Sequence, residues 1–459
     1  MTLLANSETI SQRDRRWHLH SQTNPNLHEQ SGPLVIERGE GPYVFDTDGN
    51  RYLDVMAGLW CASLGFNHPR LSKAAAKAYE AMGFYHTFSG RSSPAVVDAA
   101  EAIGSILPFE NGKIYFATSG SEANETMVKF AWLYHAAHGQ PNRRKIISRK
   151  QSFHGSTIAA ASMTGLPHMH REFGLPLSGF IHTDTPDMYR GRLPAESDED
   201  YAARMAQSLE TLILQEGSET IAAMIAESVQ AGAGIIIPPA GYFAKIREVL
   251  DRYGILLLDD EIVCGFGRTG HWFGCQAVGM EPDMISMAKG LSSGYFPISA
   301  IAISPKIYDA IRSFNGIGGN LGHGFTNSGH PVGAAIVAEA LRVYGEMKVP
   351  FHTLDLGERL FATLRPLARE SAVVGNVRSI GMLVGLELVA DKDAKLPFAS
   401  DLNANARIEK IARGSGLMLR MQGNTVTFCP PYILTEDHLA EIGSAFSATL
   451  SAFEREVLG

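Results

Sequence analysis

Short, unbroken apolar runs are the clearest feature of the hydrophobic pattern in this chain. The runs at 221–226 and 255–258 have the length of strands buried on both faces, and acidic residues follow each of them. Further strands are predicted at 113–118, 145–149 and 282–289. Apolar residues recur at helical spacing between them, as at 122–134 and 201–217. Strands that alternate with helices predict an α/β fold.

Two of the predicted strands end in reactive side chains. The run at 255–258 leads into Asp259, Asp260 and Glu261, and the strand at 282–289 ends in Lys289. Ligands of an open α/β sheet bind beyond the carboxyl ends of its strands, so the acid and the amine face one crevice. Such a pair suits pyridoxal phosphate, because the lysine can form a Schiff base while the carboxylate keeps the pyridine nitrogen protonated. A lone aspartate or lysine would more often be structural.

The surrounding residues closely resemble the signature of class III aminotransferases, the omega-aminotransferases among the fold type I pyridoxal-phosphate enzymes. The matching residues are 260–270, 282–283 and 288–290, and the likeness extends from roughly Gly39 to Pro431. This resemblance implies that Lys289 is the Schiff-base lysine and that Asp260 pairs with the pyridinium nitrogen. It also implies that Ile262, on the same strand face as Asp260, packs against the ring.

The resemblance also implies a domain organisation. A large domain that binds pyridoxal phosphate, with a mostly parallel sheet flanked by helices, is expected at 66–330. A smaller α+β domain is expected from an N-terminal arm and strands at 1–65 and a C-terminal part at 331–459. Its predicted strands include short ones within 35–54 and longer ones at 381–388, 416–421 and 425–431.

The segment at 113–129 reads as a strand, a small-residue turn and the start of a helix. The free amides and the dipole at such a helix start favour an anion, although a Ser-Gly-Ser turn alone often only caps a helix. The longer run at 118–126 resembles the phosphate loop of the family almost residue for residue. This implies that Gly120 and Ser121 bind the cofactor phosphate.

The resemblance implies three more cofactor contacts. Phe153 stacks on the outer face of the ring, where many relatives carry tyrosine, and His154 holds the loop. Glu227 lies near the pyridine nitrogen. After Glu227 the chain departs from the family pattern, with Ser228 in place of proline and alanines in place of glycines at 231 and 233. The departure predicts an altered loop path and pocket floor.

Substrate contacts are also implied by the resemblance rather than by composition. Trp60 is expected at the substrate entrance and Phe88 in the pocket wall, although such residues are more often packed core or loop residues. Arg420 is expected to grip a carboxylate and to swing away for amines, whereas an isolated arginine is usually a surface residue. The glycine-rich segment at 318–331 is expected to cross a homodimer interface, where Phe325 and Thr326 would contact the phosphate held by the other subunit.

Composition excludes several other classes of protein. The 459 residues include 40 basic and 48 acidic side chains, a net charge of −8 without a basic tract, which argues against nucleic acid as a partner. The four cysteines are widely spaced and form no CxxC motif, so neither a disulfide framework nor a metal site is expected. No secretory signal or apolar run long enough for a bilayer is present, and a cytoplasmic location is expected.

The predicted function is therefore that of a pyridoxal-phosphate-dependent omega-aminotransferase with a ping-pong cycle. It would move an amino group from an amine or omega-amino acid to a keto acid, with pyruvate the expected acceptor. A decarboxylase, racemase or aminomutase on the same scaffold is the alternative, since each would need Lys289 and Asp260. A non-catalytic protein that binds pyridoxal phosphate is the second alternative.

Overall fold

The computed structural model describes residues 8–314 and 320–458 of the chain, and its centre is a seven-stranded sheet. The order is β4-β10-β9-β8-β7-β5-β6. The strands are β4 (Lys113–Ala117), β5 (Lys145–Arg149), β6 (Phe180–Thr183), β7 (Ile221–Ala226), β8 (Leu256–Asp260), β9 (Met284–Met287) and β10 (Ser299–Ile303). Strand β10 is antiparallel to both of its neighbours, and the other adjacent pairs are parallel. The expected mostly parallel sheet is confirmed.

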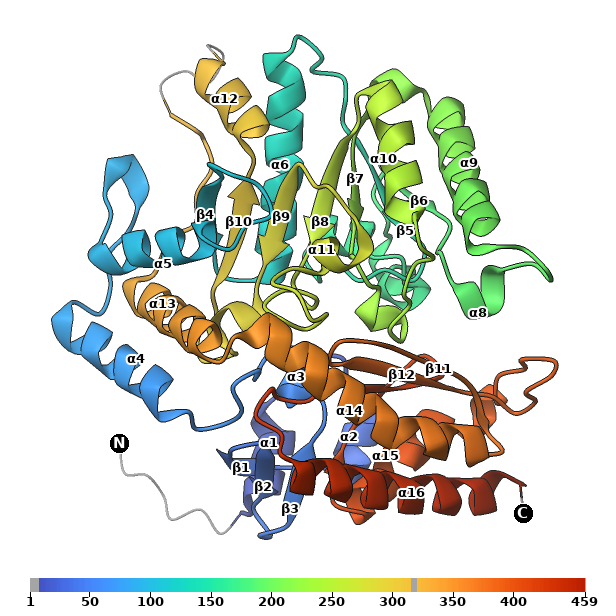
Figure 1. Cartoon of the computed structure of the whole chain (residues 1–459). Helices are drawn as coiled ribbons and strands as arrows, with labels where there is room; N and C mark the ends of the chain where they lie inside the picture. The colour runs from blue at the N-terminus through green and yellow to red at the C-terminus, as the bar shows by residue number, and fades with distance from the viewer. Residues whose placement is uncertain (1–7, 315–319, 459) are drawn as a thin grey trace.

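Both faces of this sheet are covered because its strands are apolar at successive positions. In β8, Leu256 and Leu258 pack in the same cluster as helix α6 (Gly120–Ala137), whereas Leu257 packs with α10 (Tyr242–Tyr253) on the other face. Successive side chains of a strand point to opposite faces, so an unbroken apolar run needs helices on both. Figure 1 shows these helices flanking the strands.

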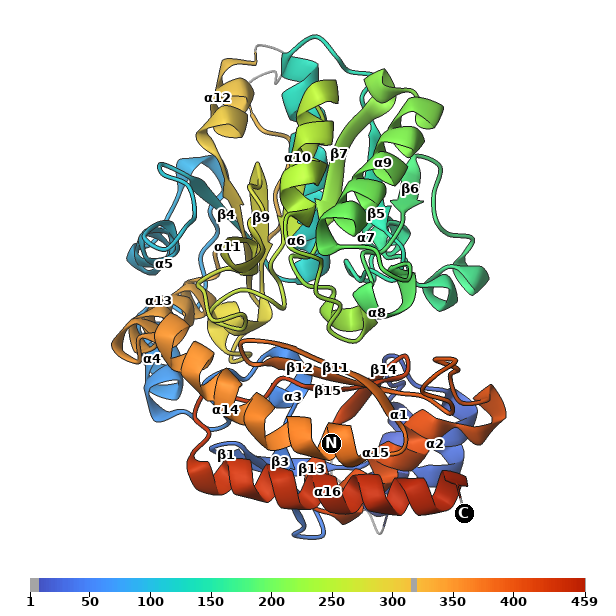
Figure 2. The same ribbon diagram turned by 45° about the vertical axis from the view of Figure 1, so that its right-hand side comes forward.

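Two four-stranded sheets, β1-β2-β3-β13 and β11-β12-β15-β14, are built from the two ends of the chain. Their strands are β1 (Ile36–Glu40), β2 (Tyr43–Asp46), β3 (Arg51–Asp54), β11 (Val374–Ile380), β12 (Leu383–Leu388), β13 (Leu417–Met418), β14 (Arg420–Gln422) and β15 (Thr425–Phe428). Figures 1 and 2 show both sheets in the lower part of the molecule, beside α14 (Val349–Glu370), α15 (Ala404–Gly414) and α16 (Glu436–Leu458). N- and C-terminal segments meet directly where β13 pairs with β3.

The prediction of one continuous strand at 416–421 is wrong. Leu417 and Met418 pair in parallel with β3, and Arg420 begins a separate strand that is antiparallel to β15. Leu419 lies buried between the two pieces. Leu417, Met418 and Leu419 form one unbroken apolar run up to Arg420, so hydrophobic pattern alone could not locate the break.

The other helices of the described residues surround these three sheets. They are α1 (Ile10–Trp17), α2 (Pro25–Ser31), α3 (Ala57–Trp60), α4 (Pro69–Ala81), α5 (Pro94–Gly104), α7 (Ile158–Met163), α8 (Met188–Gly191), α9 (Asp198–Glu216), α11 (Gly274–Val278), α12 (Pro305–Ser313) and α13 (Pro331–Glu346). None of the helices within 8–314 and 320–458 has both the length and the hydropathy to cross a bilayer. The domain boundaries stay a prediction, and Gly318 and Gly319 of the predicted interface loop lie outside the described residues.

Candidate active site

A cavity of about 390 Å³ opens at the carboxyl ends of β7, β8 and β9. The start of α6 forms one part of its wall, and α3 and β14 form another. Most of the site residues expected from the sequence line it, namely Trp60, Gly120, Ser121, Phe153, His154, Glu227, Asp260, Ile262, Lys289 and Arg420. The cavity therefore gathers residues that lie far apart in the sequence.

Asp260 ends β8 and is held by donors from three segments. Its Oδ2 accepts a hydrogen bond from Asn124 Nδ2 at 2.7 Å and lies 2.8 Å from His154 Nδ1. Its Oδ1 accepts one from the amide of Ile262 at 3.1 Å. These contacts fix the orientation of a carboxylate that is 3% exposed.

Lys289 follows β9 and begins a short 3₁₀ turn, Lys289–Ser292. Its φ of 46° lies in the left-handed region, which is unusual for a residue other than glycine and occurs often at functional sites. Its Nζ lies 5.6 Å from the ring centroid of Trp60, whose φ is also positive, at 60°. The turn thus presents the amine to the cavity beside an aromatic wall.

The start of α6 has the form of an anion site. Ser119 caps the helix, with its Oγ accepting a hydrogen bond from the Glu122 amide at 3.2 Å. The next amides, those of Gly120 and Ser121, belong to the first turn, where no carbonyl lies one turn earlier to accept them. Ser121 Oγ accepts a hydrogen bond from the Ser156 amide at 3.0 Å, which joins this turn to the loop after β5.

Close packing between Gly120 and Ile262 shapes one wall of the cavity. A Cβ at Gly120 would lie 2.6 Å from Ile262 Cδ1, so a side chain there would displace that isoleucine. The expectation that Ile262 shares a strand face with Asp260 is wrong, because β8 ends at Asp260 and Ile262 lies in the following turn. Ile262 nevertheless lines the cavity, as does Phe153.

Glu227 is a buried acid at the cavity wall. The Phe153 amide donates to its Oε1 at 3.4 Å, and its Oε2 lies 3.8 Å from Nη2 of the buried Arg149. Burial raises the pKa of Glu227 to about 7, although the charges of His154 and Arg149 act to lower it. Arg149 Nη2 also donates to the carbonyl of Glu227, which fixes the end of β7.

Beyond Glu227, the chain forms a tight turn at 231–233, followed by Gly234 with a positive φ. Ser228 is buried and Gly232 lines the cavity, where a Cβ would lie 3.2 Å from that of Phe153. The turn therefore approaches the cavity through a glycine. The altered loop path expected from the Ser228 and alanine departures stays a prediction.

Arg420 lines the cavity from the first position of β14. Its carbonyl accepts a hydrogen bond from Thr427 Oγ1 at 3.0 Å, so the backbone is anchored to β15. Within the described part of the chain, no side chain or carbonyl accepts a hydrogen bond from its guanidinium. The charged end is thus available to a ligand.

Three expected site residues do not line this cavity. Phe88 is 45% exposed and packs near Gly324, where a Cβ would lie 2.8 Å from Phe88 Cε1. Phe325 is half-buried and Thr326 is exposed on the same loop. Within one chain, these residues form a separate group.

Two polar residues of the site, one buried behind the cavity wall and one that lines it, were not singled out by the sequence analysis. Asn124 is fully buried and donates both to Asp260 and to the carbonyl of His154, while Ser286 Oγ donates to its Oδ1 at 2.6 Å. An amide among the apolar residues of α6 was the signal that could have identified it. Gln22, from the segment between α1 and α2, also lines the cavity, and its Nε2 lies 3.2 Å from Met169 Sδ.

The residues fit pyridoxal phosphate in charge, shape and donor set. A carboxylate and an amine share the cavity with an anion-binding helix start, and glycines at 120 and 232 keep space beside Ile262 and Phe153. His154 Nε2 and Glu227 Oε2 are buried without a hydrogen-bond partner among the described residues. Unsatisfied buried polar atoms at a cavity wall indicate a bound group that would satisfy them.

Comparison with known proteins agrees with this site. Residues 26–450 match the family model described as aminotransferase class-III. The chain is 43% identical over 426 residues to gamma-aminobutyrate transaminase 1, mitochondrial, of Oryza sativa subsp. indica, which covers 93% of this chain and 82% of that protein. It is 42% identical to gamma aminobutyrate transaminase 2 of Solanum lycopersicum, covering 93% of each.

Solved structures of similar proteins have the same fold. The omega transaminase from Pseudomonas jessenii in complex with PMP superposes with a TM-score of 0.96 at 41% identity, covering 98% of this chain and 99% of that one. The PMP-bound aminotransferase from Vibrio fluvialis gives a TM-score of 0.95 at 38% identity, covering 98% and 100%. The expected α/β fold of the fold type I class is confirmed.

Proposed function

The chain belongs to the class III aminotransferases, which use pyridoxal phosphate, and from this premise we propose that it is an omega-aminotransferase with a ping-pong cycle. The donor is an amine or omega-amino acid and the acceptor is a keto acid, pyruvate. The observation that carries the proposal is the convergence of Lys289, Asp260 and Arg420 on one cavity.

Substrate choice follows from the rest of the cavity wall. Apolar side chains form much of it, including Leu59, Trp60, Phe153, Leu166, Met169 and Val263. An apolar wall favours the carbon chain of an amine, and Arg420 matches the carboxylate of a keto acid through its bidentate fork. An omega-amino acid can use both, because its carboxylate is remote from its reacting amine. The names of the rice and tomato relatives, gamma-aminobutyrate transaminases, agree with this class of donor.

We assign the proton transfers to this chain's own groups. When bound, pyridoxal phosphate supplies an aldehyde that condenses with amines and a ring that accepts electrons. Lys289 Nζ lines the cavity and would be the base that takes the proton from the donor carbon and holds it for return. Asp260, fixed by Asn124 and His154, keeps a negative charge at the cavity wall and so favours a protonated ring nitrogen.

The test is to separate the two half-reactions in an Arg420→Ala variant. A charged bidentate hydrogen-bonded pair that is shielded from water contributes a few kcal/mol, so its loss should cost about 10²-fold in kcat/KM. The loss should fall on the half-reaction with pyruvate or alanine, while that with a carboxylate-free arylalkyl amine stays within about threefold. Single-turnover absorbance of the cofactor's aldehyde and amino forms measures each half.

An equal loss in both halves would show that Arg420 is structural. No loss in either would place the carboxylate anchor elsewhere. Failure of the wild-type protein to form alanine from pyruvate with any donor of a broad amine panel would refute the proposed acceptor.

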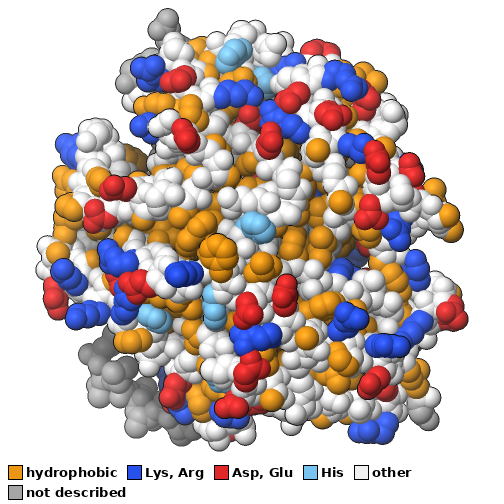
Figure 3. All heavy atoms as spheres, viewed as in Figure 1, with side chains coloured by type: hydrophobic (Ala, Val, Ile, Leu, Met, Phe, Trp, Pro, Cys, Tyr) orange, Lys and Arg blue, Asp and Glu red, His pale blue; other side chains and the backbone are white. Residues whose placement is uncertain are grey.

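We also propose a homodimer in which the partner subunit's Phe325 and Thr326 complete the phosphate site. Three observations support it: Thr326 is exposed, the loop does not line its own cavity, and Phe88 packs near that loop. Figure 3 shows hydrophobic side chains gathered across the middle of one face. Exposed large apolar residues of α4, the segment after it and α5 include Tyr79, Met82, Phe84, Tyr85, Phe88 and Val97.

Subunit complementation tests this arrangement. Lys289→Ala chains should be inactive, and Thr326→Ala chains should bind cofactor weakly. A mixed dimer would contain one complete site, with Lys289 from one chain and Thr326 from the other, so mixing after partial unfolding should restore activity to at most half of the wild-type level. No recovery from mixed dimers that are verified by mass would contradict a shared site.

We further propose a cytoplasmic location, supported by four free cysteines that are widely spaced in the sequence. Several plant relatives are named as mitochondrial or chloroplastic proteins, so fractionation of the native host with compartment markers is the required measurement. Enrichment in an organelle fraction would refute the proposal.

A further inference from the structure

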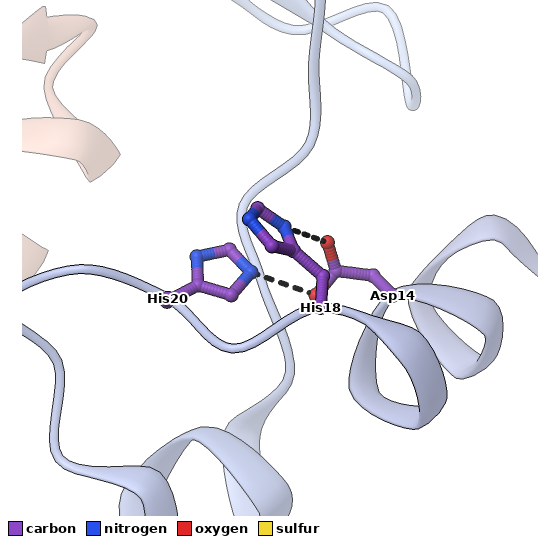
Figure 4. A group of neighbouring side chains, drawn as sticks. All are labelled: Asp14, His18 and His20. Carbon is purple, nitrogen blue, oxygen red and sulfur yellow. Dashed lines mark hydrogen bonds and ion pairs between the residues drawn. The ribbon is translucent and has the colours of Figure 1, made fainter.

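Three histidines and an aspartate meet at the N-terminal end of the described chain. Asp14 lies in α1, His18 and His20 follow that helix, and His28 lies in α2. Figure 4 shows Asp14, His18 and His20, with one carboxylate oxygen of Asp14 facing each of the two imidazole rings. Neither the active-site cavity nor the proposed reaction uses these side chains.

Each of the three histidines places one ring nitrogen close to a carboxylate oxygen of Asp14. Asp14 Oδ2 lies 3.3 Å from His18 Nδ1, and Asp14 Oδ1 lies 2.9 Å from His20 Nε2 and 3.2 Å from His28 Nε2. Zn²⁺ bonds imidazole nitrogen and carboxylate oxygen at about 2.0–2.2 Å, which places neighbouring ligands of a tetrahedral site about 3.3 Å apart. The three imidazole rings are close as well, with centroids 4.3 Å apart for His18 and His20 and for His20 and His28.

Hydrogen bonds within the cluster satisfy His18 and His20 but leave His28 without a partner in the described part of the chain. His18 and His20 each have the geometry of a hydrogen bond with Asp14. The side chain of His28 is only 9% exposed, and its Nε2 has no hydrogen-bond partner among the described residues although it points at the same carboxylate oxygen as His20. A buried nitrogen without a partner is costly, and a shared cation would satisfy it.

A neighbouring cavity gives a metal ion access to the cluster, and the nearby arginine side chains are bound to other groups. A cavity of about 250 Å³ adjoins the cluster, and the His18 side chain is 64% exposed, so an ion can enter from solvent. The nearby cations are Arg15 and Arg16. Arg15 donates to the Glu29 carbonyl, and Arg16 pairs with Glu8 at 3.2 Å.

We propose that Asp14, His18, His20 and His28 bind a divalent transition-metal ion, Zn²⁺, which clamps α1 to α2. Imidazole with one carboxylate is a ligand set suited to zinc, and it needs none of the cysteines whose spacing argued against a metal site. The clamp closes a loop that contains Gln22, a residue of the active-site cavity. The ion is therefore structural, and it holds the arm that contributes to the cavity wall.

The test is zinc binding by the full-length, tag-free protein loaded with cofactor. After chelation and removal of the chelator, wild-type protein titrated with Zn²⁺ alone should bind one ion per chain, measured by elemental analysis after gel filtration. Loss of outer-shell partners of metal ligands typically weakens binding 10–100-fold, so His20→Ala and His28→Ala should weaken it by at least about 10²-fold. His138→Ala is the matched control, because that exposed histidine lies at the end of α6 and is not part of the cluster.

Two further readouts distinguish coordination from a merely structural effect. His18→Ala alters an exposed side chain and should fold normally, yet it should lose the intense visible bands of four-coordinate Co²⁺ that wild-type protein gives. Zn²⁺ should also slow tryptic cleavage at Arg13, Arg15 and Arg16 of α1 in wild-type protein but not in His20→Ala.

Less than stoichiometric zinc binding by wild-type protein would overturn the proposal. So would retention of the ion by His18→Ala and His20→Ala, because it would then lie elsewhere, such as beside the buried Asp259, Glu261 and Cys275. Transamination by the wild-type protein is assayed separately, so failure of the clamp and failure of the proposed reaction can be told apart.

Discussion

Asn124 offers a sharp test of how the site holds its acid. Its side chain is fully buried and makes three hydrogen bonds: to Asp260 Oδ2 and to the His154 carbonyl, each at 2.7 Å, and from Ser286 Oγ at 2.6 Å. The perturbation is Asn124→Ala, which removes one of the two donors on Asp260 Oδ2 and leaves the His154 carbonyl and the Ser286 hydroxyl without this partner.

The expected magnitude follows from those contacts. A hydrogen bond to a charged group contributes about 1.5–3 kcal/mol, and 1.36 kcal/mol corresponds to a factor of ten in rate. If the bond to Asp260 stabilises the transition state more than the bound ground state, kcat should fall about 10- to 150-fold. Each buried group left without a partner costs about 1–3 kcal/mol, so the free energy of unfolding should also fall, by roughly 3–5 kcal/mol in total.

The assay is kcat and KM for alanine formation, with thermal unfolding and cofactor affinity measured on the same samples. Ser286→Ala is the matched control, because it removes only the bond on the far side of Asn124 and leaves both donors of the amide in place. Its kcat should stay within about threefold of wild type. A loss of stability in Asn124→Ala with an unchanged kcat would refute the view that Asn124 positions Asp260 for the reaction.

Two other predictions concern the acids of the cavity. Asp260→Asn should still fold and bind cofactor but should lose about 10²- to 10³-fold in kcat, because the fixed negative charge is removed; near-normal turnover would exclude this role. Glu227→Gln should stabilise the cofactor-free protein at high pH only. Because the pKa of Glu227 is raised from 4.5 to about 7, the folded state binds the proton more tightly than the unfolded state. The wild-type protein therefore loses stability as the pH rises from about 4.5 to 7. The difference should vanish below about pH 4.5 and reach at most roughly 3 kcal/mol above pH 7, so a thermal-unfolding difference independent of pH would contradict it.

The sequence predicted those parts of the fold that are set by local pattern. The run at 221–226 matches β7 because residues buried on both faces leave an unbroken apolar signal. The segment at 145–149 matches β5, although only Ile146 and Ile147 in it are apolar. Lys289 and Asp260 could be assigned because a long motif surrounds them. Predictions that depended on such local signals needed no knowledge of distant contacts.

Features made by distant contacts could not be read in this way. Asn124 reaches Asp260 across 136 positions, and only its polar character within an apolar helix face marked it. His28 joins Asp14, His18 and His20 only because α2 folds back beside α1. Phe88, Phe325 and Thr326 stay outside the cavity of their own chain, so their proposed roles depend on a second subunit that no single-chain pattern describes.

The break between β13 and β14 explains how one arginine could serve two kinds of substrate. Strand β14 lies at the edge of its sheet and is only Arg420–Gln422, but its backbone is fixed by β15 and by the Thr427 hydroxyl. Leu419 is buried immediately before it, which further limits movement of the main chain. The guanidinium, by contrast, has no acceptor among the described residues. A fixed backbone with an unpaired charged end confines any change to side-chain rotamers, so the proposed exchange between amine and keto acid would require no movement of the sheet.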